Sequence, residues 1–164
     1  MYHKTVNVIK ELLNTNNCWY QYFTHNEVKT SQEASKIRPG YTLNQGAKAL
    51  ILKYKINGTY NFVMFVLQGS DKLNSKVAKK LLNTSNLTFA TEQEVFNLTD
   101  GVKIGGVPPF GNLFNIPVYT DSKLLTKNKK IIFNAGDRCV SIAMLSSDYI
   151  KLVNPIIANF SEEL

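Results

Sequence analysis

Two apolar segments joined by an Asn-Gly pair limit the folds open to this chain. The first segment, 49–56, reads ALILKYKI, and the second, 60–67, reads YNFVMFVL. Asn57 and Gly58 between them readily take the positive φ angles of a type I′ turn, which joins antiparallel strands. Because residues 62–67 of the second segment are apolar without interruption, they predict a strand buried on both faces at the centre of a sheet. The sequence therefore predicts a β-sheet built around this hairpin.

Helices and further strands alternate around the hairpin. Apolar residues at helical spacing predict a helix over residues 3–14, and residues 75–82 predict an amphipathic basic helix. Two capping boxes, TSQE at 30–33 and TEQE at 91–94, predict the starts of two short helices. Strands are expected at 19–23, 87–89, 116–119, 131–133 and 140–145. Without a repeat or a linker, the 164 residues predict one α+β domain, 1–164, with a mixed sheet.

A loop rich in glycine and proline, KIGGVPPFG, occupies residues 103–111. Gly105 and Gly106 leave backbone N–H groups uncovered by side chains, while Pro108 and Pro109 fix φ and stiffen the loop. Such a loop suits the binding of a carbonyl, ester or phosphate oxygen. A tight turn between strands is the alternative, and the loop alone does not decide between the two.

The chain has 19 basic residues, of which only Arg38 and Arg138 are arginines, and a formal net charge of +7. This surplus suits a polyanionic partner such as a nucleic acid, although the abundance of Lys and Asn also fits a biased coding composition. No apolar run approaches the ~20 residues of a membrane span, and the N-terminal segment lacks a signal-peptide pattern. Cys18 and Cys139 have neither metal-binding nor disulfide spacing. We expect a cytoplasmic protein without membrane contact, metal or cofactor.

Familiar catalytic motifs are absent, since the chain contains no GxSxG, HExxH, Walker loop or dinucleotide fingerprint. His3 and His25 are the only histidines, and their position near the N-terminus disfavours a Ser-His-Asp relay. Lys48 precedes an apolar segment, where it is either a strand lysine with an exposed end or a cation placed in a pocket. The polar loops at strand ends, 103–111 and 134–138, are therefore the candidate sites.

Four segments carry a family resemblance through their order and spacing. They read KTSQEASKI at 29–37, LNQGAKALILK at 43–53, GGVPPFG at 105–111 and FNAGDRCVSI at 133–142. Together they resemble the YbaK family, the prolyl-tRNA editing superfamily of aminoacyl-tRNA deacylases. The similarity extends from about residue 25 to about residue 148, and synthetase catalytic segments are absent. The chain therefore resembles the freestanding, trans-acting members of that family.

This resemblance implies a mixed, barrel-like β-sheet flanked by short helices, and hydrolysis of the ester that joins a wrong amino acid to the 3′ end of tRNA. It places the family's critical lysine at Lys48 and its glycine-rich loop at Gly105 and Gly106. The other residues that the motifs place at the substrate are Pro108, Pro109, Phe110, Gly111, Asn134, Ala135, Gly136, Asp137 and Ser141. Some relatives carry a histidine near the second loop, and this chain has none there, which leaves the proton carrier open.

The implied reaction has modest chemical needs, because an aminoacyl ester is already activated. It requires a positioned water, donors for the oxyanion and an anchor for the terminal adenosine. We assign the donors to the amides around Gly105, Gly106 and Gly136, and the positioning of the ester and adenosine to Lys48. The neighbouring ribose hydroxyl is the proton relay that the resemblance suggests. The amino-acid pocket is expected from residues for which core packing is the alternative: Tyr22, Phe23, His25, Thr30, Met64 and Phe110.

The expected partner is the acceptor end of a misacylated tRNA, above all tRNA-Pro carrying Ala or Cys, with prolyl-tRNA synthetase as a further candidate. Lys76, Lys79 and Lys80 form either a footprint for the acceptor stem or an ordinary solvated helix face. A monomer is the default expectation. Two alternatives stay open: a non-catalytic module of the same fold that binds tRNA or a nucleotide, and a hydrolase of another small activated ester.

Overall fold

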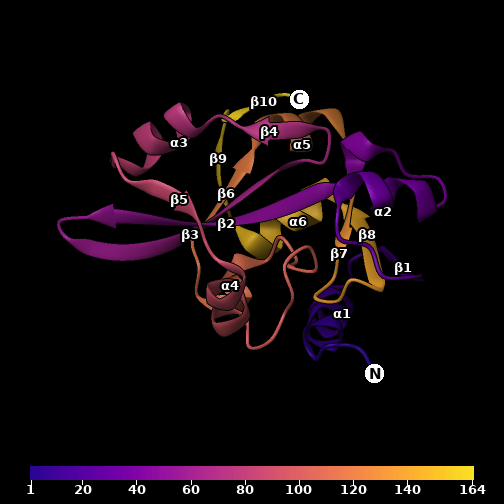
Figure 1. Ribbon diagram of the computed structural model, residues 1–164. Coiled ribbons are helices and arrows are strands. Elements are labelled where there is room, and N and C mark those ends of the chain that lie inside the picture. Colours follow the sequence, from indigo (N-terminus) through magenta and orange to yellow (C-terminus); the bar gives the residue numbers. More distant parts are fainter.

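The computed structural model describes residues 1–164, in which helices and strands alternate along the chain (Figure 1). The helices are α1 (Thr5–Thr15), α2 (Ser31–Ile37), α3 (Ser75–Leu82), α4 (Glu92–Leu98), α5 (Ser122–Lys127) and α6 (Ser146–Val153), with 3₁₀ turns η1 (Leu43–Gln45) and η2 (Gly111–Phe114). The strands are β1 (Tyr20–Thr24), β2 (Ala47–Ile56), β3 (Thr59–Gln68), β4 (Asp71–Leu73), β5 (Leu87–Phe89), β6 (Val118–Asp121), β7 (Lys130–Asn134), β8 (Val140–Leu145), β9 (Ile156–Ala158) and β10 (Ser161–Glu163). This composition confirms the predicted α+β class.

The β2–β3 hairpin lies inside a mixed five-stranded sheet with the order β5-β2-β3-β6-β9. The two strands pair antiparallel over their whole lengths, and the hairpin projects to the left in Figure 1. Asn57 and Gly58 have φ angles of 50° and 77°, as the predicted type I′ turn requires. β6 runs parallel to β3, and β9 runs parallel to β6. The predicted hairpin and the mixed character of the sheet are both confirmed.

A second, antiparallel sheet with the order β1-β8-β7 lies on the right in Figure 1. An isolated parallel bridge between Gly46 and Ile132 connects its β7 edge to the residue that precedes β2. β4 and β10 form a separate antiparallel pair, in which Glu163 lies opposite Asp71. The chain therefore brings the start of β2 next to both the three-stranded sheet and the β4–β10 pair.

Apolar side chains cover both faces of β3 over residues 63–67, which accounts for the uninterrupted apolar run in this part of the strand. On one face, Met64 and Val66 are fully buried in a cluster with residues of α1, α6 and the three-stranded sheet. On the other face, Phe65 and Leu67 pack in a second cluster with α3 and Phe160. Removal of this apolar surface from water is the main force that holds the sheets and helices together. β3 is a central strand, as predicted.

The two predicted capping boxes form to different extents. At α4, Thr91 Oγ1 accepts from the Glu94 N–H at 3.1 Å, and Glu94 Oε1 accepts from the Thr91 N–H at 3.0 Å. At α2, Thr30 Oγ1 accepts from the Glu33 N–H at 3.1 Å, but the Glu33 carboxylate accepts from the Lys29 N–H at 3.1 Å. In the box at α2, the Glu33 carboxylate thus accepts from the residue before the expected donor, and this bond fixes the backbone at Lys29.

The predicted helix over residues 3–14 corresponds to α1, and the predicted strand at 116–119 is displaced toward the C-terminus. β6 begins only after Pro117, which has no N–H to donate to a neighbouring strand. None of the helices is both long enough and apolar enough to cross a membrane.

Candidate functional site

A cavity of about 300 Å³ opens between α2, the first residues of β2 and the loop 103–111, and we call it the site pocket. Its lining consists of Lys29, Thr30, Ser31, Gln32, Ala34, Arg38, Gly46, Ala47, Lys48, Ala49, Leu50, Ile104, Gly105, Val107 and Asn134. This size is at the lower end for ligand pockets, so it suits a small group rather than a long chain. The lining includes three cationic side chains and no Asp or Glu, so the pocket favours anionic or electron-rich ligand atoms.

Gly105 approaches the segment before α2 more closely than any other residue type would allow. Its φ is +86°, and a Cβ built on it would lie 2.6 Å from the carbonyl oxygen of Lys29. Gly105 lines the site pocket, and its N–H donates to no acceptor within the protein. This N–H is therefore available to a ligand oxygen.

Two of the other amides assigned from the sequence as donors are already occupied. The Gly106 N–H donates to the Lys103 carbonyl at 2.9 Å, and the Gly136 N–H donates to the Gly106 carbonyl at 2.9 Å. These bonds tighten the first loop and tie the second loop to it. Their geometry corrects the expectation that both amides face the substrate, because a backbone N–H already bonded to a carbonyl is a poor donor for a second oxygen.

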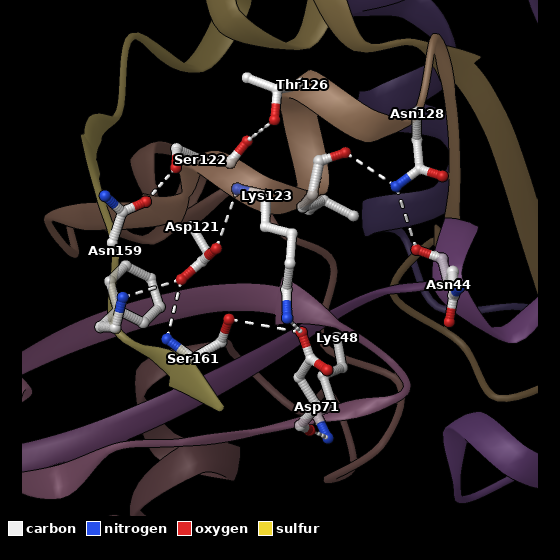
Figure 2. A network of polar contacts seen from close by, with 12 residues as sticks. Asn44, Lys48, Asp71, Asp121, Ser122, Lys123, Thr126, Asn128, Asn159 and Ser161 are labelled. Atoms are coloured by element: carbon white, nitrogen blue, oxygen red, sulfur yellow. Dashed lines mark hydrogen bonds and ion pairs between the residues drawn. The ribbon is translucent and has the colours of Figure 1, made fainter. Parts of the chain in front are cut away.

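The Lys48 side chain lines the site pocket, and its ammonium group reaches the β4 end of the sheet. Lys48 Nζ donates to the backbone carbonyl of Asp71, as Figure 2 shows. Partial burial lowers the pKa of Lys48 below its usual value, and the nearby charge of Asp71 acts in the opposite direction. The ammonium group of Lys48 is thus partly buried and hydrogen-bonded within the protein, and it is not a free, solvated strand end.

The residues around Asp71 form a polar network that holds this part of the structure together (Figure 2). The buried Asp71 carboxylate pairs with Lys123 Nζ at 2.6 Å and accepts from the Ser161 hydroxyl at 3.3 Å. Asp121 Oδ2 accepts from the Phe160 and Ser161 N–H groups at 2.8 Å each. β10 and the start of α5 therefore fix the carboxylate next to Lys48 from two sides.

Arg38 enters the site pocket from the end of α2. It is only 7% exposed. Its Nε donates to Ser141 Oγ at 2.9 Å and its Nη2 donates to Asn134 Oδ1 at 2.8 Å. Asn134 Nδ2 in turn donates to the Gly105 carbonyl at 2.7 Å. A continuous chain of hydrogen bonds therefore runs from α2 through β7 to the glycine loop.

The structure brings His25 to the second loop, although the sequence places it more than 100 residues away. His25 Nε2 lies 2.7 Å from Ser141 Oγ, and Ser141 is fully buried. Neither residue lines the site pocket. His25 therefore orients Ser141, which accepts a hydrogen bond from Arg38. The buried Ser141 is not an accessible nucleophile.

Two aromatic residues expected to line an amino-acid pocket lie elsewhere. Tyr22 is 36% exposed on β1 and packs under Lys10, whose Nζ is 4.4 Å from the ring centroid. Phe23 packs edge-on against Tyr41 with the ring centroids 6.0 Å apart. Of the candidates from this N-terminal segment, only Thr30 lines the site pocket.

Several loop residues expected at the substrate belong to the core instead. Phe110 is fully buried and contacts Phe133 and Tyr149, with ring centroids 5.5 and 5.7 Å away. The other buried members are Met64, Pro108, Pro109, Gly111 and Ala135. For these residues, the core-packing alternative is the one that the structure shows.

Tyr149 fastens the proline part of the loop to the core. Its hydroxyl donates to the Pro109 carbonyl at 2.8 Å and lies 3.1 Å from Thr120 Oγ1, all within the buried interior. Complete burial raises the pKa of Tyr149 far above its usual value. The loop 103–111 is therefore rigid at its proline end as well as at its glycine end.

We predict that Tyr149→Phe lowers the free energy of unfolding by about 1–3 kcal/mol, because it leaves the buried Pro109 carbonyl without a partner. Urea denaturation followed by circular dichroism should show a lower midpoint and an unchanged slope. Tyr60→Phe is the matched control, since Tyr60 is 52% exposed. Equal midpoints for Tyr149→Phe and the wild type would contradict the assignment.

A second cavity of about 330 Å³ lies behind the two loops and includes Gly136 and Asp137 in its lining. Asp137 is engaged within the protein: Oδ2 accepts from the His3 N–H at 3.1 Å and Oδ1 accepts from the Cys139 N–H at 2.9 Å. The structure thus separates Gly136 and Asp137 from Lys48 and Gly105, which line the site pocket.

Arg38, Ser31 and Gln32 line the site pocket, although none of them is among the site residues expected from the sequence. In the sequence, Ser31 and Gln32 lie in the middle of a capping box and within the segment 29–37 that carries the family resemblance. Arg38 had one distinguishing sign, since it is one of two arginines among 19 basic residues. An arginine in a chain that otherwise uses lysine indicates a candidate site residue, because a planar guanidinium forms several directed hydrogen bonds.

The chain is similar to known proteins over most of its length. The sequence profile of the aminoacyl-tRNA editing domain matches residues 25–152. The multifunctional Ser/Thr-tRNA deacylase ProXp-y of Escherichia coli (strain K12) is 30% identical over 149 residues, which are 91% of this chain and 88% of that protein. A proline–tRNA ligase of Staphylococcus epidermidis (strain ATCC 12228) is 32% identical over 107 residues, 64% of this chain but 17% of the ligase.

Solved structures show the same fold at lower sequence identity. A candidate trans-editing enzyme for prolyl tRNA synthetase superposes with a TM-score of 0.81 at 22% identity and covers 99% of both chains. The hypothetical protein APE2540 superposes with a TM-score of 0.80 at 22% identity, covering 94% of this chain and 99% of that chain.

Proposed function

The chain belongs to the family of aminoacyl-tRNA editing domains, and we propose that it acts in trans to hydrolyse the ester between a small, wrong amino acid and the 3′ end of tRNA. The observation that carries this proposal is the site pocket, in which Lys48 and the unoccupied N–H of Gly105 line one small cavity. A cation and a free backbone donor are the groups that ester hydrolysis needs.

The reaction follows from these groups. A water molecule attacks the ester carbonyl carbon, and the carbonyl oxygen gains negative charge as the new C–O bond forms. The Gly105 N–H donates to that oxygen, and Lys48 positions the ester and the terminal adenosine. The tetrahedral species then collapses and the bond to the ribose oxygen breaks. That oxygen takes the proton that the attacking water gives up, which passes through the neighbouring ribose hydroxyl.

The lining of the site pocket narrows the amino acids to consider. Ser31 and Gln32 supply polar side chains beside the small apolar surfaces of Ala34 and Ala47. Such a wall favours a small side chain that carries a hydroxyl, because polar groups that lose water on binding and find no partner on the substrate cost binding energy. We therefore propose Ser and Thr, in line with the name of the relative from E. coli, as substrates beside the Ala- and Cys-tRNA-Pro predicted from the sequence.

The tRNA and any synthetase partner are also part of the proposal. The net charge of +7 suits a salt-dependent contact with the phosphates of an acceptor stem. Prolyl-tRNA synthetase is a candidate partner, since some proline–tRNA ligases contain a segment similar to this chain.

A panel of charged tRNAs tests the proposal. The protein is incubated with tRNA-Pro carrying Ala, Cys, Ser, Thr or Pro, and the remaining aminoacyl ester is measured over time. We expect loss of at least one small amino acid well above the rate without protein, while Pro-tRNA-Pro is spared. If no ester is lost faster than it is spontaneously, the enzymatic proposal fails; tRNA binding without hydrolysis would indicate the non-catalytic alternative.

A further inference from the structure

Arg38 is a buried cation without an anionic partner. Only 7% of its surface is exposed, and no Asp or Glu oxygen lies within ion-pair distance of it. Charged side chains are almost never this buried unless paired, because loss of hydration is costly. Arg38 is compensated only by the neutral oxygens of Ser141 and Asn134. An unpaired charge maintained at this cost points to a ligand group that completes the pairing.

The free edge of the guanidinium lies on the wall of the site pocket. Nε and Nη2 are bonded to Ser141 and Asn134, whereas Nη1 donates to no acceptor in the protein. Nη1 lies 3.8 Å from the point that a Cβ on Gly46 would occupy, and both Gly46 and Arg38 line the pocket. The absence of a side chain at Gly46 therefore keeps the approach to Nη1 open.

The orientation of this cation is fixed before any ligand arrives. Two of its three nitrogens are hydrogen-bonded, and Ser141 is held in turn by His25. Asn134 connects the guanidinium to the carbonyl of Gly105, the residue whose N–H is free. A charge that needs no reorientation during the reaction is the most effective way to stabilise a developing anion.

We propose that Arg38 stabilises the oxyanion that forms on the ester carbonyl, with its Nη1 N–H groups donating to that oxygen beside the Gly105 N–H. When water adds to the carbonyl carbon, the electron pair of the C=O bond moves to this oxygen. When the pair returns, the bond to the ribose oxygen breaks, and that oxygen takes the proton that the attacking water gives up. Arg38 gives up no proton in either step. This inference rests on the proposed deacylase function and adds a catalytic residue to it.

Arg38 keeps its charge under ordinary conditions. Burial lowers its pKa to about 10, which still leaves the guanidinium protonated at neutral pH. Lys29 and Lys48 also line the pocket, and no acid lines it. The Asp71 carbonyl holds one of the three N–H groups of Lys48, whereas the guanidinium of Arg38 is held at two of its nitrogens and keeps Nη1 free.

Single-turnover deacylation of Arg38→Lys and Arg38→Ala tests the assignment, using whichever charged tRNA the wild type hydrolyses. We expect the rate constant at saturating enzyme to fall about 100- to 1,000-fold in both variants, as for the loss of one oxyanion donor. The enzyme concentration at half-saturation should change little. Millimolar guanidinium ion should restore part of the activity of Arg38→Ala and none of that of Arg38→Lys. Lys151→Gln, which removes an exposed positive charge on α6, is the control and should match the wild type.

Other outcomes overturn the inference in distinguishable ways. A higher half-saturating concentration with an unchanged rate constant would make Arg38 a ground-state binding residue. Circular dichroism in the same buffer measures the folded fraction of each variant. If activity falls only in proportion to that fraction, Arg38 has a purely structural role. The same conclusion follows if guanidinium ion does not rescue folded Arg38→Ala. If Arg38→Ala does not fold, the rate constant of Arg38→Lys decides the question. Wild-type protein that deacylates no tRNA removes the proposed function and this inference together, whereas active wild type with equally active variants removes only the inference.

Discussion

Replacing Lys48 by alanine is expected to slow deacylation by about 100- to 1,000-fold at saturating enzyme. The side chain lines the site pocket, and the Asp71 carbonyl holds its ammonium group in place. The substitution removes a positive charge from the position that orients the ester. Stability should change by only about 1 kcal/mol, because a single hydrogen bond to a carbonyl is lost. Single-turnover kinetics and a urea titration of the same preparation measure the two effects separately.

Lys55→Ala provides the matched control for Lys48→Ala. Lys55 lies on the same strand but near the hairpin turn, where its Nζ is 5.2 Å from the centroid of the Tyr60 ring. We expect its rate constant to equal that of the wild type. Equal rates for Lys48→Ala and Lys55→Ala would show that Lys48 has no part in the reaction.

The second large effect is expected for Gly105→Ala, which should reduce both stability and activity. The φ of +86° costs an alanine about 1–2 kcal/mol. The new methyl group would also lie 2.6 Å from the Lys29 carbonyl oxygen, so the loop or the segment before α2 must move. Either movement displaces the free N–H to which we assign the oxyanion, and we expect at least a 100-fold lower rate constant.

Gly58→Ala separates the two causes. Gly58 has a similar φ of +77°, but no atom lies within 4 Å of the position of a Cβ. Gly58→Ala should lose only the stability that the positive φ costs, about 1–2 kcal/mol. It should retain the rate constant of the wild type. If Gly105→Ala also retains the wild-type rate, the glycine loop does not supply the oxyanion donor.

The parts of the fold that depend on neighbouring residues could be predicted from the sequence. The Asn57-Gly58 turn is an example, because its φ angles follow from the two residues themselves. The capping box at Thr91 is another, since both partners lie within one turn of helix. At α2 the same pattern differs by one residue, because Glu33 accepts from Lys29 rather than from Thr30.

The candidate site was harder to predict, because its hydrogen bonds join distant segments. The glycines were recognisable, but the occupancy of the Gly136 amide depends on contact with Gly106, 30 residues earlier. The role of Arg38 depends on Ser141, 103 residues away, and on Asn134, 96 residues away. Local sequence does not specify which donors such contacts use and which they leave free.

The pairing of β10 with β4 affects when this protein can become active during its synthesis. Asp71 holds Lys48, and its carboxylate is fixed by Ser161 and Lys123. Ser161 leaves the ribosome roughly 90 residues after Asp71, a delay of about 5–20 s at ordinary rates of translation. The hairpin and α3 can fold during that interval, while the lysine site still lacks its last support. A nascent chain should therefore acquire its structure earlier than its reactivity.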